Sequence, residues 1–168
     1  RVVKAFMAAE DRNFYEHSGI DYQGLSRAVL KNVLNVSRGR RLEGGSTITQ
    51  QVAKNVLLNS DVTFGRKFKE AILANRLEQV LSKPKIMELY LNEIWLGYRS
   101  FGVGAAAYNY FGKPLSDLTL AETAYLAALP KGPQNYQPVR NKANAIRRRN
   151  WIIGEMAELG WVTPQEAE

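Results

Sequence analysis

Apolar residues recur at intervals of three and four along most of this chain, while alternating β-branched stretches are short and few. That spacing is typical of amphipathic helices, because strands alternate with a period of two. The sequence therefore predicts a mainly α-helical fold. The expected helices cover residues 2–11, 22–36, 47–58, 64–81, 84–94, 103–110, 120–129 and 142–159, and a further one begins at Thr163 and Pro164.

The size and charge of the chain limit its class. Its 168 residues, 45% of them apolar, suffice for one compact domain with a core. Lys and Arg outnumber Asp and Glu by 23 to 16, and the net charge of +7 favours an anionic partner: nucleic acid, a phosphorylated molecule or an acidic membrane surface. The absence of cysteine and the single histidine exclude thiol nucleophiles, disulfides and zinc centres built on several such residues.

The printed sequence contains no apolar run approaching 18 residues and no signal peptide. It begins with Arg1 rather than Met and stops soon after a new helix starts. We therefore expect residues 1–168 to be one domain of a longer protein.

Residues 44–51 combine glycines, hydroxyls and amides and run directly into a helical pattern. Thr47 and Gln50 fit a capping box after a glycine turn, which would make the stretch an ordinary helix start. Alternatively, backbone N–H groups and hydroxyls at a helix N-terminus suit an oxyanion or a phosphate. Gln51, Lys54 and Asn55 would then place a cation beside amides on one helical face. Both interpretations are open at this point.

Glu10 follows an apolar helical segment, residues 2–9. A carboxylate there is a candidate general base, because partial burial raises the proton affinity of a carboxylate. A solvated acid at a helix end is the commoner case, although the negative end of the helix dipole disfavours it.

Arg66, Lys67 and Glu70 lie close together on an expected helix, where the default interpretation is a surface salt bridge between Arg66 and Glu70. His17 is by default a structural residue that organises the loop after Glu10, because no partner for a catalytic triad is nearby in the sequence.

The helix expected at 22–36 carries an apolar stripe flanked by basic residues. Such a helix most often packs its apolar face on the core, and it can also lie on an anionic bilayer. The basic run 147–149 is typical of a solvated face, and neither aromatic interleaving nor a known module indicates nucleic-acid binding. The stripe comprises Leu25, Val29, Val33 and Val36, with Arg27 and Lys31 beside it.

Five segments, in this order, resemble the motifs of the peptidoglycan glycosyltransferase family, the transglycosylase domains of penicillin-binding proteins and of monofunctional transglycosylases. The resemblance covers nearly the whole chain, and its continuation through residues 147–164 is similar to the bifunctional class A penicillin-binding proteins. The five segments are 10–19 (EDRNFYEHSG), 45–51 (GSTITQQ), 66–78 (RKFKEAILANRLE), 85–97 (KIMELYLNEIWLG) and 128–138 (ALPKGPQNYQP).

The resemblance implies a lysozyme-like helical fold with a head and a smaller, membrane-proximal jaw subdomain. It implies polymerisation of lipid II into β-1,4-linked glycan strands, with inversion and release of undecaprenyl diphosphate, for bacterial cell wall synthesis. It also implies a place at the bacterial cytoplasmic membrane with the active domain on the outer, periplasmic face, an anchor before Arg1, a transpeptidase domain after Glu168, and inhibition by moenomycin.

By the same resemblance, Glu10 matches the family's general base and Glu70 its second essential acid. Lys54 and Arg66 match cations that contact the diphosphate. The remaining matches are polar positions of the cleft, residues that shape the first motif, and a lysine of the fifth motif: Ser46, Thr47, Gln51, Asn55, Asp11, Phe14, His17 and Lys131.

The resemblance implies no obligatory cofactor and leaves open a divalent cation, Mg²⁺ or Mn²⁺, at Glu70. The expected partners are lipid II, the growing glycan strand and the membrane surface. Other cell wall synthesis proteins are left open as partners, and nucleic acid is not expected.

Two rival functions differ in what they require of the same residues. A lytic muramidase-like enzyme would cleave glycan with a single glutamate and would have no leaving diphosphate for Lys54 and Arg66 to neutralise. A non-catalytic basic module would leave Glu10 dispensable and bind membrane or nucleic acid with a strong salt dependence. The loop at 37–45 is basic and contains glycine, and we expect it to be poorly ordered without a ligand.

Overall fold

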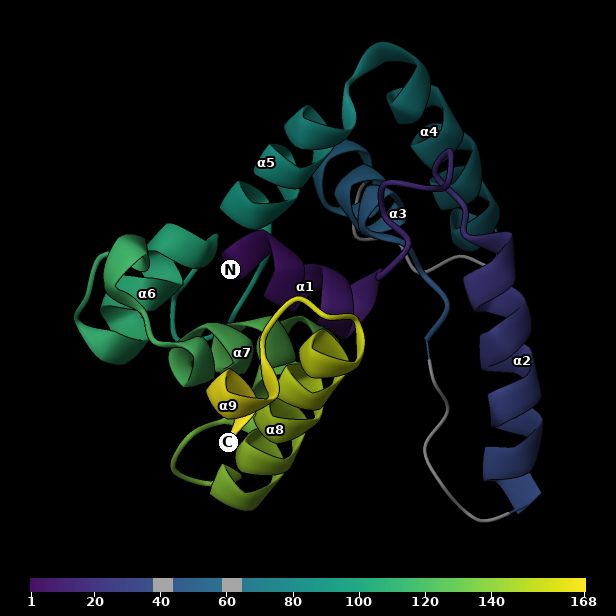
Figure 1. Cartoon of the computed structure of the whole chain (residues 1–168). Helices are drawn as coiled ribbons and strands as arrows, with labels where there is room; N and C mark the ends of the chain where they lie inside the picture. Colours follow the sequence, from purple (N-terminus) through teal and green to yellow (C-terminus); the bar gives the residue numbers. More distant parts are fainter. Residues whose placement is uncertain (38–43, 59–64) are drawn as a thin grey trace. The chain divides into compact units, whose positions relative to one another are not determined.

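The computed structural model describes residues 1–37, 44–58 and 65–168 (Figure 1). Within these ranges the chain forms helices joined by turns, and the only extended pairing is an isolated antiparallel bridge between Trp95 and Phe101. The prediction of a mainly α-helical fold is confirmed. The expected disorder of the loop at 37–45 concerns residues 38–43, which lie outside the described ranges, as does Phe64 at the expected start of a helix.

All eight helices expected from the apolar spacing are present, with ends shifted by one or two residues. The one difference in type follows Val52, where the expected α-helix becomes a short π-helix, η1 (Ala53–Leu57). The α-helices are α1 (Val2–Glu10), α2 (Tyr22–Ser37), α3 (Ile48–Val52), α4 (Arg66–Val80), α5 (Lys83–Glu93), α6 (Val103–Phe111), α7 (Leu120–Ala128), α8 (Lys142–Glu158) and the short α9 (Pro164–Ala167), with 3-10 turns η2 (Leu115–Asp117), η3 (Leu129–Lys131) and η4 (Pro133–Tyr136).

Three of these helices begin at a capping box, among them the one predicted at Thr47. The hydroxyl oxygens of Thr47, Thr119 and Thr163 each accept a hydrogen bond from a backbone N–H three residues later. The Gln or Glu side chain at that later position accepts one from the threonine's own N–H. Each box satisfies N–H groups that a helix end would otherwise leave unpaired.

The described residues form two compact units: unit 1 comprises Arg1–Arg12 and Glu88–Glu168, and unit 2 comprises Asn13–Met87. The core of unit 1 is built around α7, which packs against both α1 and α8 (Figure 1). Side chains of all three helices are fully buried there, among them Phe6, Leu126 and Ile152. This packing fixes the end of α1, where Glu10 lies.

In unit 2, α3 packs against α4 and buries Ile48, Val52 and Ala74. The apolar side of α2 behaves differently. An apolar stripe of this kind most often packs on the core. On α2 it does not, because those side chains of the stripe that the structure describes are exposed to solvent. The exposed large apolar residues of α2 are Leu25, Val29, Leu30, Val33 and Leu34, and the side chain of Val36 is not described. No helix within the described residues is long and apolar enough to cross a bilayer.

Candidate functional site

Glu10 is the last residue of α1 and is partly buried. The next residue, Asp11, is almost fully buried and ends the helix, its backbone N–H donating to the carbonyl of Met7 at 2.8 Å. The expected partial burial of Glu10 is therefore present. Two adjacent carboxylates at this helix end need positive or neutral polar groups around them.

Tyr90 of α5 supplies one neutral polar group. Its side chain is 1% exposed, and within the described part of the chain its hydroxyl has no hydrogen-bond partner. Burial raises the pKa of Tyr90 well above its ordinary value, and the negative charges of Glu10 and Asp11 raise it further. Tyr90 therefore stays protonated beside the two carboxylates.

Arg148 of α8 supplies a positive charge at the same helix end. Its guanidinium donates to the carbonyl of Ala9 at 3.1 Å and lies 4.1 Å from the ring centre of Trp151. A cation bound to the last carbonyls of a helix offsets the negative end of its dipole, which makes a carboxylate at Glu10 less costly. The prediction that the run 147–149 is a solvated face is wrong for Arg148, because it packs between α1 and Trp151.

We expect the substitution Arg148→Met to lower the free energy of unfolding by about 1–2 kcal/mol, because it removes a charge-assisted hydrogen bond and a cation–π contact. Arg147→Met is the matched control, since Arg147 is exposed on the same helix and, among the residues that the structure describes, bonds only to Asn144. Chemical denaturation of both variants measures the difference. Equal losses would show that the contact with Ala9 contributes nothing to stability.

The loop after Glu10 is fixed from several sides within unit 2. The backbone N–H of Gly19 donates to Nδ1 of His17 at 3.1 Å, and Phe14 is buried with its ring edge-on to that imidazole. Lys83 lies 4.5 Å from the centre of the Phe14 ring. Gly19 has φ +101°, and a Cβ there would lie 2.9 Å from the carbonyl carbon of Ala74, so only glycine fits this close approach to α4.

Thr47 connects this loop to α3. Its buried hydroxyl donates to the carbonyl of Gly19 at 2.7 Å and accepts from the N–H of Gln50. The capping box predicted at Thr47 is present, and the Thr47 hydroxyl makes two structural hydrogen bonds. The anion-binding interpretation of residues 44–51 stays a prediction. Thr47 therefore shapes the segment and leaves Ser46 as the neighbouring hydroxyl that a ligand can reach.

The clearest ionic cluster in unit 2 surrounds Glu70, which is 2% exposed. Lys67 Nζ lies 2.9 Å from Glu70 Oε2, and Arg66 Nε lies 3.4 Å from Glu70 Oε1. Lys67 also donates to the hydroxyl of Ser46 at 2.6 Å. In place of the expected surface salt bridge, the structure has a buried carboxylate paired with two cations. The shorter of the two distances is that to Lys67, which was not among the residues predicted for the site. The i, i+3 spacing of Lys67 and Glu70 is the signal that could have identified it.

These cations stand at the start of α4, where the dipole already has its positive end. The first turn of α4 contains no acidic residue, and its N-cap, Gly65, has no side chain to bond the free N–H groups. Arg66 and Lys67 would repel that positive end unless a negative group balanced them. Glu70 supplies one negative charge, so the cluster retains an excess of positive potential that suits an anion.

Lys54 and Asn55 lie in η1 and are exposed, and Gln51 at the end of α3 is partly buried. The prediction that all three share one face assumed an α-helix throughout, whereas the segment after Val52 is a π-helix. The shared face itself stays a prediction. A π-helix makes wider turns, and such segments frequently occur at functional sites. Lys131 ends η3 in unit 1 and is exposed.

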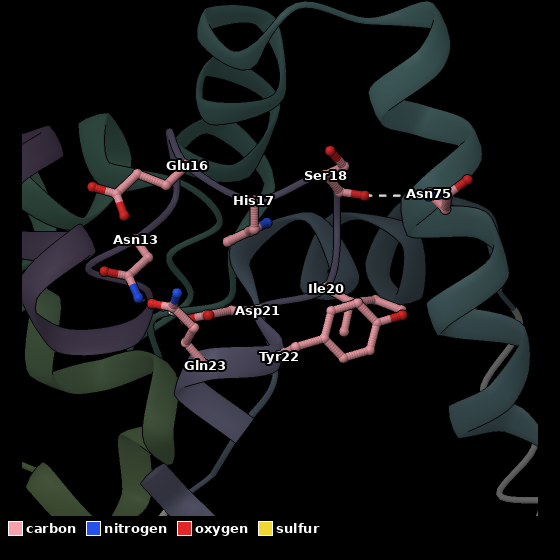
Figure 2. Close-up of a pocket in the computed structure, with 9 residues that line it drawn as sticks. All are labelled: Asn13, Glu16, His17, Ser18, Ile20, Asp21, Tyr22, Gln23 and Asn75. Atoms are coloured by element: carbon pink, nitrogen blue, oxygen red, sulfur yellow. Dashed lines mark hydrogen bonds between the residues drawn. The ribbon is translucent and has the colours of Figure 1, made fainter. Parts of the chain in front are cut away.

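A polar pocket of about 500 Å³ lies in unit 2 beside the loop of the first motif (Figure 2). Its lining includes His17, the two acids Glu16 and Asp21, and Asn75 of α4, which donates to the carbonyl of Ser18 at 3.4 Å. None of its lining residues is lysine or arginine. The lining offers two carboxylates, and the cation nearest to Asp21, Arg27 at 3.9 Å, lies outside it, so this pocket does not suit a diphosphate.

The residues at Glu70 do not fit a divalent cation held by the protein. Both of its oxygens face cationic side chains. Across the described ranges, no group of three or more histidine or acidic side chains is arranged to hold a metal.

Comparison with known proteins identifies the family. The sequence profile of the family described as Transglycosylase matches residues 1–157. The chain is 48% identical over 167 residues to penicillin-binding protein 1A of Rickettsia felis, covering 99% of this chain and 21% of that protein. It is 50% identical over 167 residues to the protein of the same name from Aquifex aeolicus, covering 99% and 23%. The chain thus spans about a fifth of the length of these relatives.

A solved structure gives the same result. The 2.6 Å crystal structure of penicillin-binding protein 1A from Haemophilus influenzae is similar to this chain with a TM-score of 0.50 and 45% sequence identity. The match covers 52% of this chain and 13% of that one. Because the family profile covers nearly the whole chain and the relatives are about half identical to it, the chain belongs to the transglycosylase family, the peptidoglycan glycosyltransferases that its five motifs predicted.

Proposed function

We propose that this chain polymerises lipid II into β-1,4-linked glycan strands with inversion and release of undecaprenyl diphosphate. The observation that carries the proposal is the cation cluster at the start of α4: Arg66 and Lys67 at the positive end of a helix, balanced by the single buried acid Glu70. A transferase with a diphosphate leaving group needs such a site, whereas a glycan hydrolase does not.

Glu10 is the proposed general base. Its carboxylate takes the proton of the acceptor's GlcNAc 4-hydroxyl as that oxygen attacks the anomeric carbon of the donor. The cation of Arg148 on the carbonyl of Ala9 offsets the negative end of the α1 dipole, which makes a carboxylate at this helix end less costly.

The bond to the donor's diphosphate breaks as the new glycosidic bond forms, and the leaving oxygen gains negative charge. We assign the stabilisation of that charge to Arg66 and Lys54, with Lys67 as a third cation. Glu70 orients Arg66 and Lys67 and lowers their mutual repulsion. Ser46, Gln51 and Asn55 are the proposed polar contacts to the sugar diphosphate, and the reaction as proposed has no obligatory cofactor.

The exposed apolar side of α2 supports a place at a membrane surface. Val29, Leu30 and Val33 are each more than half exposed on this helix, and Arg27 and Lys31 lie on it as well. An exposed apolar stripe with basic neighbours suits the interface of an anionic bilayer. A lipid-linked substrate would be delivered there, and the proposed location is the outer face of the bacterial cytoplasmic membrane.

The test is incubation of the purified domain with lipid II in detergent, with separation of the products on a gel. We expect a ladder of glycan strands that a muramidase digests, together with undecaprenyl diphosphate in proportion to the bonds formed. Shortening of added glycan without consumption of lipid II would instead establish a lytic enzyme. Salt-sensitive binding to vesicles with neither reaction would establish a non-catalytic module.

A further inference from the structure

A second pocket, in unit 1, is built from the fourth and fifth motifs, and none of its lining residues belongs to the predicted catalytic or diphosphate-binding set. It has a volume of about 370 Å³. Aromatic rings, prolines and side-chain amides line it, and no lining residue carries a charge. Such a lining suits a neutral ligand that has both apolar faces and hydrogen-bonding edges.

The pocket depends on a close approach of two segments distant in sequence. Gly97 has φ +74°, and a Cβ at this position would lie 2.6 Å from Cβ of Pro133 and 3.0 Å from the hydroxyl of Tyr110. Tyr110 in turn donates to the carbonyl of Leu96 at 2.7 Å. The pocket wall is therefore fixed in shape before any ligand arrives.

Tyr98 is held over this wall by a strained turn. Both Tyr98 and Arg99 adopt positive φ, of 48° and 56°, which non-glycine residues rarely do. Asn109 of α6 donates to the carbonyl of Tyr98 at 3.3 Å and to the hydroxyl of Ser100 at 3.0 Å, which keeps the turn in place. The result is a tyrosine side chain that is 69% exposed and whose ring lies 5.5 Å from that of Tyr110. Strain of this kind tends to persist where a side chain has a function.

The amides of the pocket are oriented by bonds to the backbone. The Gln137 side-chain oxygen accepts from the N–H of Val139 at 2.9 Å and also from that of Arg140, so its Nε2 hydrogens remain as donors for a ligand. Asn109 uses its nitrogen on the turn, so its oxygen remains as an acceptor. A fixed donor and a fixed acceptor beside aromatic faces match a pyranose ring, which has C–H faces and hydroxyl edges.

We propose that this pocket binds a stretch of neutral amino-sugar glycan. The aromatic face of Tyr98 stacks on a sugar ring, and the amides of Gln137 and Asn109 bond its hydroxyl and acetamido groups. The choice of a saccharide over a proline-rich peptide rests on the proposed function, since a glycan polymerase has its own product at hand. The absence of lining charges excludes nucleic acid and charged peptides as good ligands.

The test uses a linear tetramer of N-acetylglucosamine as the probe and measures binding without turnover. We expect fluorescence of Trp95, at the pocket, and NMR shifts of the Gln137 side-chain amide to report binding by the wild-type domain. The variant Tyr98→Asn should weaken the affinity about tenfold or more. Its thermal stability should be unchanged or higher, because asparagine tolerates positive φ better than tyrosine. Tyr108→Ala is the matched control: Tyr108 is 60% exposed on α6 but does not line the pocket, so its affinity should equal wild type.

Three results would overturn the proposal: no shift of the Gln137 amide with the tetramer, equal weakening in the Tyr98 and Tyr108 variants, or Tyr98-dependent binding of a proline-rich peptide in place of the saccharide. Binding that persists in Glu10→Gln would support a site separate from the reaction. Because no turnover is needed, a failure to polymerise lipid II would leave this measurement unaffected, and the two proposals can fail independently.

Discussion

Replacing Glu10 by glutamine is expected to slow the polymerisation of lipid II at least a hundredfold while the domain stays folded. General base catalysis contributes about 10²–10⁴-fold to a rate, and glutamine keeps the shape of the side chain but cannot accept the proton. Stability should stay equal or rise slightly, because a neutral amide at the end of α1 no longer opposes the helix dipole. The initial rate of glycan formation and the thermal unfolding midpoint measure the two effects.

Glu16→Gln is the control for this prediction. Glu16 belongs to the same motif, is exposed and has the same charge, so its substitution alters the net charge equally. We expect its rate to remain within about twofold of wild type, as for a surface substitution away from the chemistry. Equal loss in both variants would point to charge or folding rather than proton transfer. Full activity of the Glu10 variant would assign the base to another residue.

The helices could be predicted from the sequence because local signals decide them. Apolar spacing and the capping boxes at Thr47, Thr119 and Thr163 are properties of segments of a few residues, and the structure places the helices within a residue or two of those signals. The π-helix at Ala53–Leu57 could not be predicted in this way. Over five residues the spacing of a π-helix hardly differs from that of an α-helix, so the sequence contains too little information to separate them.

The identity of the candidate site residues could be predicted where they belong to a sequence motif. Their burial and their partners could not, because these depend on packing. The spacing of Arg66 and Glu70 indicates an ion pair, but only the packing of α4 shows that Glu70 is buried and that Lys67 is the nearer cation. Arg148 looked solvated within a basic run, yet it donates to the carbonyl of Ala9, more than 100 residues away, and packs on Trp151, three residues further along the same helix. The long-range contact with Ala9 has no local signature.

The turn at Tyr98 is a second feature that the sequence alone could not predict. Positive φ is ordinarily predicted from glycine or asparagine, and the sequence Gly97, Tyr98, Arg99 gives that signal only at its first residue. The bonds from Asn109 of α6 hold the other two residues in the left-handed region. A pocket that depends on this turn could therefore be recognised only from the structure.

Replacing Glu70 by glutamine is expected to lower the polymerisation rate about a hundredfold, since a misplacement of about 1 Å among groups that position a substrate can cost that much. Glutamine cannot balance the charges of Arg66 and Lys67, which then repel each other at the positive end of α4. Stability should fall by only about 1 kcal/mol, because the Lys67 side chain is largely exposed and water screens its charge.

Glu78→Gln separates a catalytic from a structural role. Glu78 lies on the same helix, accepts from Thr49 at 2.7 Å and pairs with Lys83 at 2.6 Å, so its loss should lower stability by a similar amount or more but leave most of the activity.

Binding of inorganic diphosphate gives a second readout. In Glu70→Gln the affinity should hold or rise, because a negative charge beside Arg66 and Lys67 is gone, even as the rate falls. A variant that loses rate and stability in the same proportion as Glu78→Gln would reduce Glu70 to a structural residue. Slow turnover with retained diphosphate binding would instead show that the carboxylate acts by placing the cations where the departing charge develops.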